Sequence, residues 1–128
     1  MLALDTNIVV RLLTEDEKAQ AAQARRLVGS NTTFVSDTVI LETEWVLRSL
    51  YRLAPAEIIA GLRRFLGLEG VALENSARIA AALDQAEAGL DFADALHLAH
   101  AAHCEAFVTF DKALVRAARG GALPVRAP

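Results

Sequence analysis

Short apolar runs alternate along the chain with longer segments in which apolar residues recur at helical spacing. Four runs have the length and composition of strands: "MLAL" (1–4), "TTFVS" (32–36), "VAL" (71–73) and "AFVTF" (106–110). Helices are predicted over about residues 7–13, 15–28, 38–51, 55–66, 74–90, 92–104 and 112–119, with a last extended piece at 123–128. Strands that alternate with helices predict an α/β protein with a parallel sheet covered on both faces.

Proline and glycine mark several of the predicted helix ends. Pro55 fits the first turn of its helix, Gly67 or Gly70 ends that helix, and Gly89 closes the next one. The chain shows no repeat, no low-complexity segment and no linker. Its length of 128 residues therefore predicts a single domain over residues 1–128.

The composition favours a well-packed protein of the cytoplasm. Hydrophobic residues make up 54% of the chain, yet no uninterrupted apolar stretch approaches the ~20 residues that a membrane helix needs. Asp5 without a basic flank argues against a signal peptide. The lone Cys104 excludes an internal disulfide, and its place in a helical, apolar stretch predicts a small buried side chain rather than a reactive thiol.

The formal net charge of −3 is not that of a protein that binds nucleic acid through bulk positive charge. The charge is unevenly distributed, however, because the segment after Asp111 carries four basic residues and no acidic one. Arginine contacts phosphate through two parallel hydrogen bonds. Arg116 and Arg119, together with Arg11, are therefore candidate contacts to a phosphate backbone. The alternative is a solvated helix face with a basic tail.

Two aspartates stand directly after predicted strands. Asp5 follows the first strand and Asp111 follows the run at 106–110, and a helix is predicted to begin after each. In open α/β sheets the ligand crevice lies beyond the carboxyl ends of the strands, so both side chains are expected at the same place. The alternative for each is a helix N-cap, which an aspartate between strand and helix commonly provides.

Asp94 has no such alternative, because it lies one turn inside its helix, on the side of Leu90 and His97. Asp91, just after Gly89, stands where a helix needs a cap. Asp94 is therefore a candidate site residue whose position capping does not explain, and Asp91 is an additional acid beside it.

The third predicted helix carries two glutamates with different surroundings. Glu44 has Arg48 four residues later, which predicts an ion pair on the surface. Glu42 has Val39 and Val46 at neighbouring helical positions, which places its carboxylate on an apolar face. Such a carboxylate indicates either an error in the assumed helical register or a ligand role, and the ligand role explains more.

Four acids from separate elements are thus predicted to converge at one end of the sheet: Asp5, Glu42, Asp94 and Asp111. Converging carboxylates repel one another and become partly neutral unless a cation is present. Ligation by oxygen alone suits Mg²⁺ or Mn²⁺, which keep several waters and meet phosphate oxygens. The pattern therefore predicts a metal site for phosphoryl chemistry, with one ion or two.

Two other classes of protein stay open on these residues. A haloacid-dehalogenase-like phosphatase also begins with an aspartate at the end of a strand, but it needs a second aspartate two residues on, where this chain has Asn7. A non-catalytic α/β interaction domain would keep the acids only as helix caps, and Glu42 and Asp94 speak against it.

Four motifs occur in order over almost the whole chain: "LDTN" (4–7), "ILETEWVLR" (40–48), "DFADALHLA" (91–99) and "FVTFD" (107–111). Together they resemble a PIN-domain ribonuclease of the VapC/FitB toxin type. The resemblance implies a three-layer α/β/α sandwich with a central, mostly parallel sheet, and Mg²⁺- or Mn²⁺-dependent endonucleolytic cleavage of RNA. It matches the acidic positions of the family onto Asp5, Glu42, Asp94 and Asp111, with Asp91 as a fifth acid.

The same resemblance implies supporting residues and partners. Thr6, Asn7 and Thr109 accompany the motifs and would orient the carboxylates or a water molecule. The expected partners are an RNA substrate and a co-encoded antitoxin protein, and the expected form is a homodimer or a higher assembly with the antitoxin. The apolar face of the helix at 55–66, with the helix around Trp45, is the candidate dimer surface, and ordinary core packing is the alternative.

Three histidines follow Asp94 at intervals of three residues. Each step turns the side chain by about 60° away from its predecessor, so His97, His100 and His103 are not expected to hold one metal ion together. His97, one turn from Asp94, is placed to reach an acidic site. The other two are expected to pack or to lie on the surface.

Overall fold

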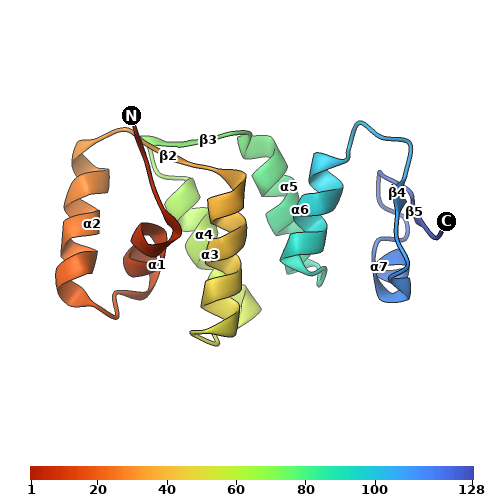
Figure 1. Cartoon of the computed structure of the whole chain (residues 1–128), viewed down its shortest axis with the longest axis horizontal. Coiled ribbons are helices and arrows are strands. Elements are labelled where there is room, and N and C mark those ends of the chain that lie inside the picture. Colours follow the sequence, from red (N-terminus) through yellow and green to blue (C-terminus); the bar gives the residue numbers. More distant parts are fainter. The chain divides into compact units, whose positions relative to one another are not determined.

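The computed structural model describes all residues, Met1–Pro128, and divides into two compact units, Met1–Asn75 (unit 1) and Ser76–Pro128 (unit 2). Unit 1 contains β1 (Leu2–Ala3), α1 (Thr6–Thr14), α2 (Lys18–Ser30), β2 (Thr33–Val35), α3 (Asp37–Ser49), α4 (Pro55–Leu66) and β3 (Val71–Leu73) (Figure 1). Unit 2 contains α5 (Ser76–Glu87), α6 (Phe92–His100), β4 (Phe107–Val108), α7 (Lys112–Ala117) and β5 (Val125–Arg126). None of the helices combines the length and the apolar character that a membrane crossing takes.

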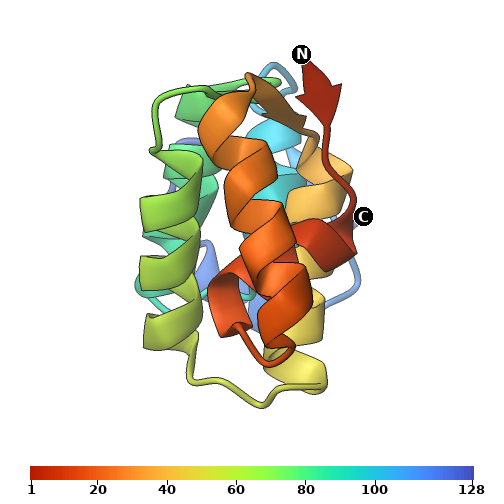
Figure 2. The same ribbon diagram turned by 90° about the vertical axis from the view of Figure 1, so that its left-hand side faces the viewer.

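The strands pair in parallel within each unit. In unit 1, β2 lies between β1 and β3, with Leu2 opposite Thr33 and Thr33 opposite Val71. Figures 1 and 2 show these strands along one end of the helices of unit 1. In unit 2, β4 pairs with β5, with Phe107 opposite Val125. The predicted alternation of strands and helices is confirmed, and the strands form a three-stranded and a two-stranded sheet. A single domain over residues 1–128 stays a prediction.

Local sequence signals set several helix ends. Pro55 occupies the first position of α4 and Gly67 ends this helix, as predicted. Gly89 follows α5 with φ at 110°, a left-handed conformation that glycine adopts without strain. The helix α6 is shorter than predicted, because it ends at His100 and a turn follows. Cys104 is exposed on that turn, so the prediction of a buried thiol is wrong.

The buried face of α3 is not the one that the sequence predicts. Ile40 and Leu47, seven residues apart, are buried, and Glu44 between them is only 7% exposed. The predicted ion pair is present, with Arg48 Nε and Glu44 Oε1 2.9 Å apart, but its carboxylate is not on the surface. Glu44 shares the inward face with Ile40 and Leu47 because these positions differ by four and three residues. Glu42 is exposed, and Val10 and Val46 line the same shallow depression beside it.

The apolar face of α4 belongs to the core of the chain. Five apolar side chains of this helix are buried: Ile58, Ile59, Leu62, Phe65 and Leu66. Burial of each such side chain contributes about 1.5–3 kcal/mol. Core packing therefore accounts for the face that the sequence offers as a dimer surface. On α3, Trp45 is 51% exposed.

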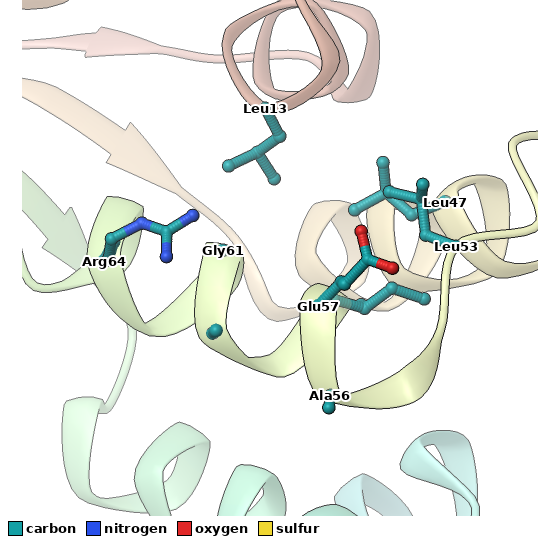
Figure 3. A pocket seen from close by; sticks show the side chains of 9 residues that line it. Leu13, Leu47, Leu53, Ala56, Glu57, Gly61 and Arg64 are labelled. Carbon is teal, nitrogen blue, oxygen red and sulfur yellow. The ribbon is translucent and has the colours of Figure 1, made fainter.

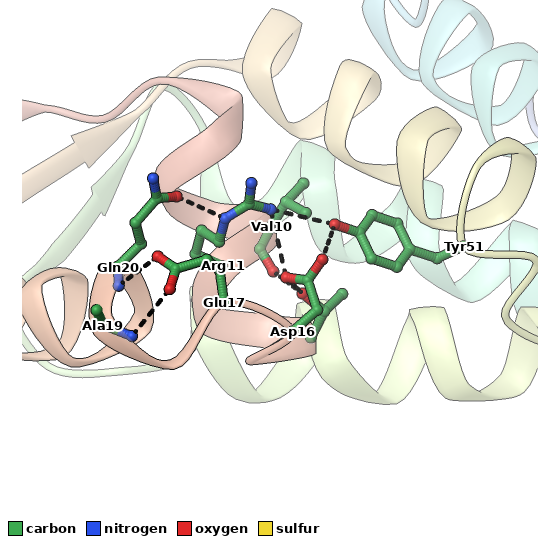
Figure 4. A network of polar contacts seen from close by, with 8 residues as sticks. Val10, Arg11, Asp16, Glu17, Ala19, Gln20 and Tyr51 are labelled. Atoms are coloured by element: carbon green, nitrogen blue, oxygen red, sulfur yellow. Dashed lines mark hydrogen bonds and ion pairs between the residues drawn. The ribbon is translucent and has the colours of Figure 1, made fainter.

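A polar network fastens the loop between α1 and α2 to the end of α3 (Figure 4). Arg11 donates to Gln20 Oε1 at 2.7 Å and to Tyr51 Oη at 3.1 Å. The Tyr51 hydroxyl in turn donates to Asp16 Oδ2 at 2.6 Å. This hydrogen bond, with a smaller contribution from Thr14, lowers the pKa of Asp16. The structure places Arg11 in a network that orders the fold, and its contact to RNA stays a prediction.

A groove of about 400 Å³ lies between the C-terminal end of α1, α3 and α4 (Figure 3). Leu13, Leu47 and Leu53 line it, together with Gly61 and Arg64 from α4. A Cβ atom built on Gly61 would lie 3.6 Å from Leu13 Cδ2, an ordinary van der Waals contact. The groove therefore has room for a methyl group at this position.

We predict that Gly61→Ala stabilises the protein. Glycine loses more conformational freedom than alanine inside a helix, so the free energy of unfolding should rise by about 0.5–1 kcal/mol. Gly89→Ala is the matched control of opposite sign, because φ at this position is 110° and strains an alanine. Urea unfolding measures both variants, and a Gly61→Ala protein no more stable than the unaltered chain would contradict the prediction.

Candidate active site

Asp5 and Glu42 lie together in unit 1. Because β1 and β2 run in parallel, α1 and α3 begin at the same edge of the sheet. Asp5 caps α1, where its Oδ1 accepts a hydrogen bond from Thr6 N–H at 2.8 Å. A shallow depression of about 260 Å³ at this edge is lined by Asp5, Thr6, Asn7 and Glu42. Two of the four predicted acids therefore share one surface feature.

Thr6 contacts both of these carboxylates. Its backbone N–H donates to Asp5 Oδ1, and its hydroxyl donates to Glu42 Oε1. Thr6 is buried, whereas the two acids are exposed. A buried threonine that donates to two exposed carboxylates holds them in a fixed arrangement, which is the kind of role predicted for Thr6 from the sequence. Asn7 lines the same depression with its side chain exposed.

Two further acids, neither of them predicted from the sequence, stand at this edge. Asp37 closely follows β2 and is buried, and Glu74 directly follows β3. Glu74 Oε1 accepts a hydrogen bond from Asp37 N–H at 2.8 Å and so satisfies a donor at the start of α3. The sequence signal was the same as for Asp5, an acid close behind a strand.

The acids of unit 2 cap helices. Asp91 caps α6, where its Oδ2 accepts from Asp94 N–H at 3.1 Å. Asp111 caps α7, where its Oδ1 accepts from Ala113 N–H at 2.9 Å and from Leu114 N–H at 3.1 Å. The capping alternative is thus confirmed for both residues. A carboxylate that caps through one oxygen still has the other oxygen as an acceptor, so capping and ligation are compatible.

Asp94 lies inside α6, and its carboxyl group has an altered pKa. Burial raises the pKa of Asp94, the negative charges of Asp91 and Asp111 raise it further, and His97 acts in the opposite direction. These three acids are therefore electrostatic neighbours that a nearby cation would stabilise. The donor atoms that these acids offer to a metal ion are carboxylate oxygens, as are those of Asp5 and Glu42. Oxygen donors of this kind fit Mg²⁺ or Mn²⁺.

Thr109 supports Asp111 from the preceding loop. Its Oγ1 accepts a hydrogen bond from Asp111 N–H at 3.0 Å, so the backbone and the side chain of Asp111 are both held. His97 and His100 are exposed on α6, and His103 is exposed on the turn that follows. Neither unit taken alone brings three His, Cys, Asp or Glu side chains close enough to hold a metal ion.

The candidate phosphate contacts Arg116 and Arg119 are exposed in unit 2, near the end of α7. Arg119 lines a groove of about 550 Å³ among small side chains of α5, α6 and the segment after α7. The predicted site residues thus form two sets. In unit 1 these are Asp5, Thr6, Asn7 and Glu42, and in unit 2 they are Asp91, Asp94, Thr109 and Asp111. That the two sets bind one metal together stays a prediction.

Residues 2–120 match the family model of the PIN domain. The chain therefore belongs to the PIN domain family, and the match runs through both units. No curated protein matches the chain. Family membership, together with parallel strands joined by helices, confirms the predicted α/β, PIN-like fold. PIN domains are generally hydrolases that cleave nucleic acid with the help of divalent metal ions.

We predict that Asp94→Asn stabilises the metal-free protein at neutral pH. The folded chain raises the pKa of Asp94. The free energy of unfolding therefore falls as the pH rises through that pKa and the carboxyl group ionises. Asparagine carries no charge and avoids this loss. The advantage should vanish below the pKa of an ordinary aspartate, where the native carboxyl group is protonated in both states.

Urea unfolding in EDTA, at neutral and at acidic pH, measures this difference. Glu105→Gln, an exposed acid of the same unit, serves as the control for a general effect of net charge. Equal stability of Asp94→Asn and the unaltered chain at neutral pH would sink the prediction.

Proposed function

We propose that the chain is a Mg²⁺- or Mn²⁺-dependent endoribonuclease whose metal is bound jointly by Asp5, Glu42, Asp94 and Asp111, with Asp91 as an additional acid. The observation that carries the proposal is the arrangement at Thr6, where one buried residue donates to carboxylates from two separate elements. Membership of the PIN domain family supports nuclease chemistry and favours it over the phosphatase alternative.

Hydrolysis of RNA needs three events at one phosphodiester. A water oxygen attacks phosphorus, the bond from phosphorus to the leaving nucleoside oxygen breaks, and the proton lost by the water is balanced by one gained at the leaving oxygen. A bound divalent ion supplies positive charge that lowers the pKa of water and stabilises the phosphate in the transition state.

The residues of the chain contribute position and charge. Thr6 occupies Glu42 Oε1 with a hydrogen bond, which leaves Oε2 as the acceptor that can face an ion. The helix caps hold the carboxylates of Asp5 and Asp111 in the same way, by one oxygen each. Since these contacts exist before substrate arrives, the acids need little reorganisation when they bind a cation.

We further propose that the enzyme is a toxin that a co-encoded antitoxin neutralises, and that it forms a homodimer. The order and spacing of the four motifs support the toxin type. The helix around Trp45 supports the dimer, since Trp45 is half exposed on α3, whereas the apolar face of α4 is buried in the chain. In the metal-free state a cluster of acids attracts a guanidinium group, so an arginine of the antitoxin is a suitable inhibitor.

We predict that each of the four acids is needed for activity. Asp5→Asn, Glu42→Gln, Asp94→Asn and Asp111→Asn should each abolish Mg²⁺-dependent cleavage of a labelled single-stranded RNA. Each should also remove the rise in Tm that Mn²⁺ produces in the unaltered chain, because a shared site loses affinity when any one ligand is removed. Gel analysis of the RNA and thermal unfolding with and without Mn²⁺ measure the two effects.

The controls are Glu69→Gln in unit 1 and Glu105→Gln in unit 2, both exposed acids outside the site. Glu44→Gln is unsuitable as a control, because Glu44 is buried against Arg48. A Mn²⁺ response that survives in the variants of one unit would show that the four acids do not form one site. Hydrolysis of p-nitrophenyl phosphate by the unaltered chain would favour the phosphatase, and the absence of any Mn²⁺ response would favour the interaction domain.

We predict that Arg116 and Arg119 contact the RNA backbone. Replacing both by alanine in the inactive Asp94→Asn chain should weaken binding of a single-stranded RNA. It should also flatten the salt dependence of log Kd by roughly 0.7 for each phosphate that the protein no longer neutralises. Fluorescence anisotropy at several salt concentrations gives the slope, and Arg26→Ala, an exposed arginine of unit 1, is the control. A slope unchanged in the double variant would leave these arginines as a solvated face.

A further inference from the structure

Two polar contacts join α1 to α3 and its end, one at the start of α1 and one in its last turn. At the start, the Thr6 hydroxyl donates to Glu42 Oε1. In the last turn, Arg11 Nη1 donates to Tyr51 Oη at 3.1 Å, and Tyr51 closely follows the end of α3. Two contacts at different heights restrict the angle between two rigid helices, whereas a single contact would let them pivot about it.

The Tyr51 hydroxyl also contacts the segment that follows α1 (Figure 4). It donates to Asp16 Oδ2 at 2.6 Å, and Asp16 Oδ1 lies 2.9 Å from the Thr14 hydroxyl. Arg11 Nη1 completes the group at 3.3 Å from Asp16 Oδ1. Several polar contacts that share members therefore connect the end of α3 to the last turn of α1.

This network is hydrogen-bonded to two residues that line the depression at the sheet edge of unit 1. The Thr14 hydroxyl donates to the carbonyl of Val10 at 2.8 Å, and Tyr51 N–H donates to the carbonyl of Val46 at 3.2 Å. Val10 and Val46 line the depression together with the two acids of unit 1. Movement of Tyr51 relative to α1 would therefore also move the two valines beside the acids.

The backbone is strained on both sides of the contact between Tyr51 and Asp16. Glu15, which precedes Asp16, has φ at 52°, and Arg52, which follows Tyr51, has φ at 55°. No other residue except glycine has a positive φ in this chain. Such strain persists only where the surrounding structure enforces it, and it is concentrated at functional sites. The two strained residues therefore indicate that this contact has a role beyond the reversal of the chain.

We propose that Tyr51 is a positioning residue for the metal site, on which it acts through α1 and α3. By holding the last turn of α1 against the end of α3, Tyr51 keeps Glu42 within reach of the Thr6 hydroxyl and in place beside Asp5. The inference rests on the proposed function, in which these two acids bind a divalent ion. The hydroxyl of Tyr51 bonds to Arg11 and Asp16 and not to the acids. Its effect is therefore on affinity for the ion and not on the chemical step.

Calorimetric titration of the full chain with Mn²⁺ alone tests the proposal in Tyr51→Phe, which loses the hydroxyl and keeps the ring. Its Kd for Mn²⁺ should rise roughly 10-fold, the lower limit for residues that orient metal ligands. The Mn²⁺ concentration that gives half-maximal RNA cleavage should rise by the same factor, while kcat at saturating Mn²⁺ is unchanged. Asp16→Ala removes the acceptor of the same hydroxyl and should raise Kd in the same way.

Arg25→Gln is the matched control. It breaks the ion pair of Arg25 with Glu15, which joins α2 to the C-cap of α1 and does not involve α3. The Kd of this variant for Mn²⁺ should equal that of the unaltered chain. An equal rise of Kd in Arg25→Gln and Tyr51→Phe would assign the effect to a general loosening of α1 and would overturn the proposal.

A double-mutant cycle with Thr6→Val separates positioning from a general loss of stability. Thr6→Val removes the hydroxyl that holds Glu42. If Tyr51 acts through this contact, Tyr51→Phe should add nothing to the Kd of the Thr6→Val chain. Two factors that multiply instead would show that the residues act independently, and the positioning role would be lost.

The outcomes distinguish this proposal from the proposed function. Native Kd in Tyr51→Phe, with Mn²⁺-dependent cleavage by the unaltered chain, would overturn the positioning role and leave the nuclease standing. A raised Kd in Tyr51→Phe, with no cleavage of RNA by the unaltered chain, would overturn the ribonuclease alone. An unaltered chain that binds no Mn²⁺ would overturn both.

Discussion

Parallel pairing of the strands is the constraint on which the positions of the acids depend. In unit 1, β1, β2 and β3 run in the same direction, so the chain leaves every strand at the same edge of the sheet. Asp5, Asp37 and Glu74 follow these strands, and α3 brings Glu42 to the same edge. With β2 reversed, α3 would start at the opposite edge and Glu42 would not reach Thr6. The concentration of negative charge is therefore a consequence of topology.

The carboxylates of unit 2 both stabilise and strain the fold. Asp91 and Asp111 satisfy backbone donors at the starts of α6 and α7, where the helix dipole favours a negative charge. Asp94 lies further inside α6, where burial raises its pKa and the negative charges of Asp91 and Asp111 raise it further. Favourable helix starts thus offset the repulsion that they help to create. Perturbed ionisable groups of this kind are common at sites that bind ions or do chemistry.

Sequence periodicity predicted the order of the elements, because the change between a period of two and a period of 3.6 is a local property. It failed where packing decides. Glu42 and Glu44 are two positions apart on α3, and the sequence does not show which of them faces inward. The structure decides this, because Ile40 and Leu47 are buried and Glu44 lies on their side of the helix. The prediction that Cys104 is buried was wrong because no residue of the sequence marks the end of α6 at His100.

Asp5, Asp91 and Asp111 are candidates from the sequence because each stands where a helix begins, and Asp94 is one because it lies inside a helix, where capping does not explain it. The sequence could not predict that Thr6 contacts both Asp5 and Glu42. The direction of its hydroxyl depends on how α1 packs against α3. Asp37 and Glu74 were missed although they occupy the same kind of position as Asp5. Position alone does not separate acids that only satisfy a helix start from acids that are free to bind.

Because Asp5, Asp91 and Asp111 start helices, their freedom to vary in evolution is restricted even in a chain that has lost its activity. Alanine at such a position removes the capping oxygen and costs about 0.5–2 kcal/mol, whereas asparagine and serine retain it. At Asp111 the loss would also loosen the loop that holds Thr109. Relatives that have lost the activity are therefore expected to carry asparagine or serine at these three positions. Neutral helix caps, rather than random replacements, should distinguish such inactive relatives.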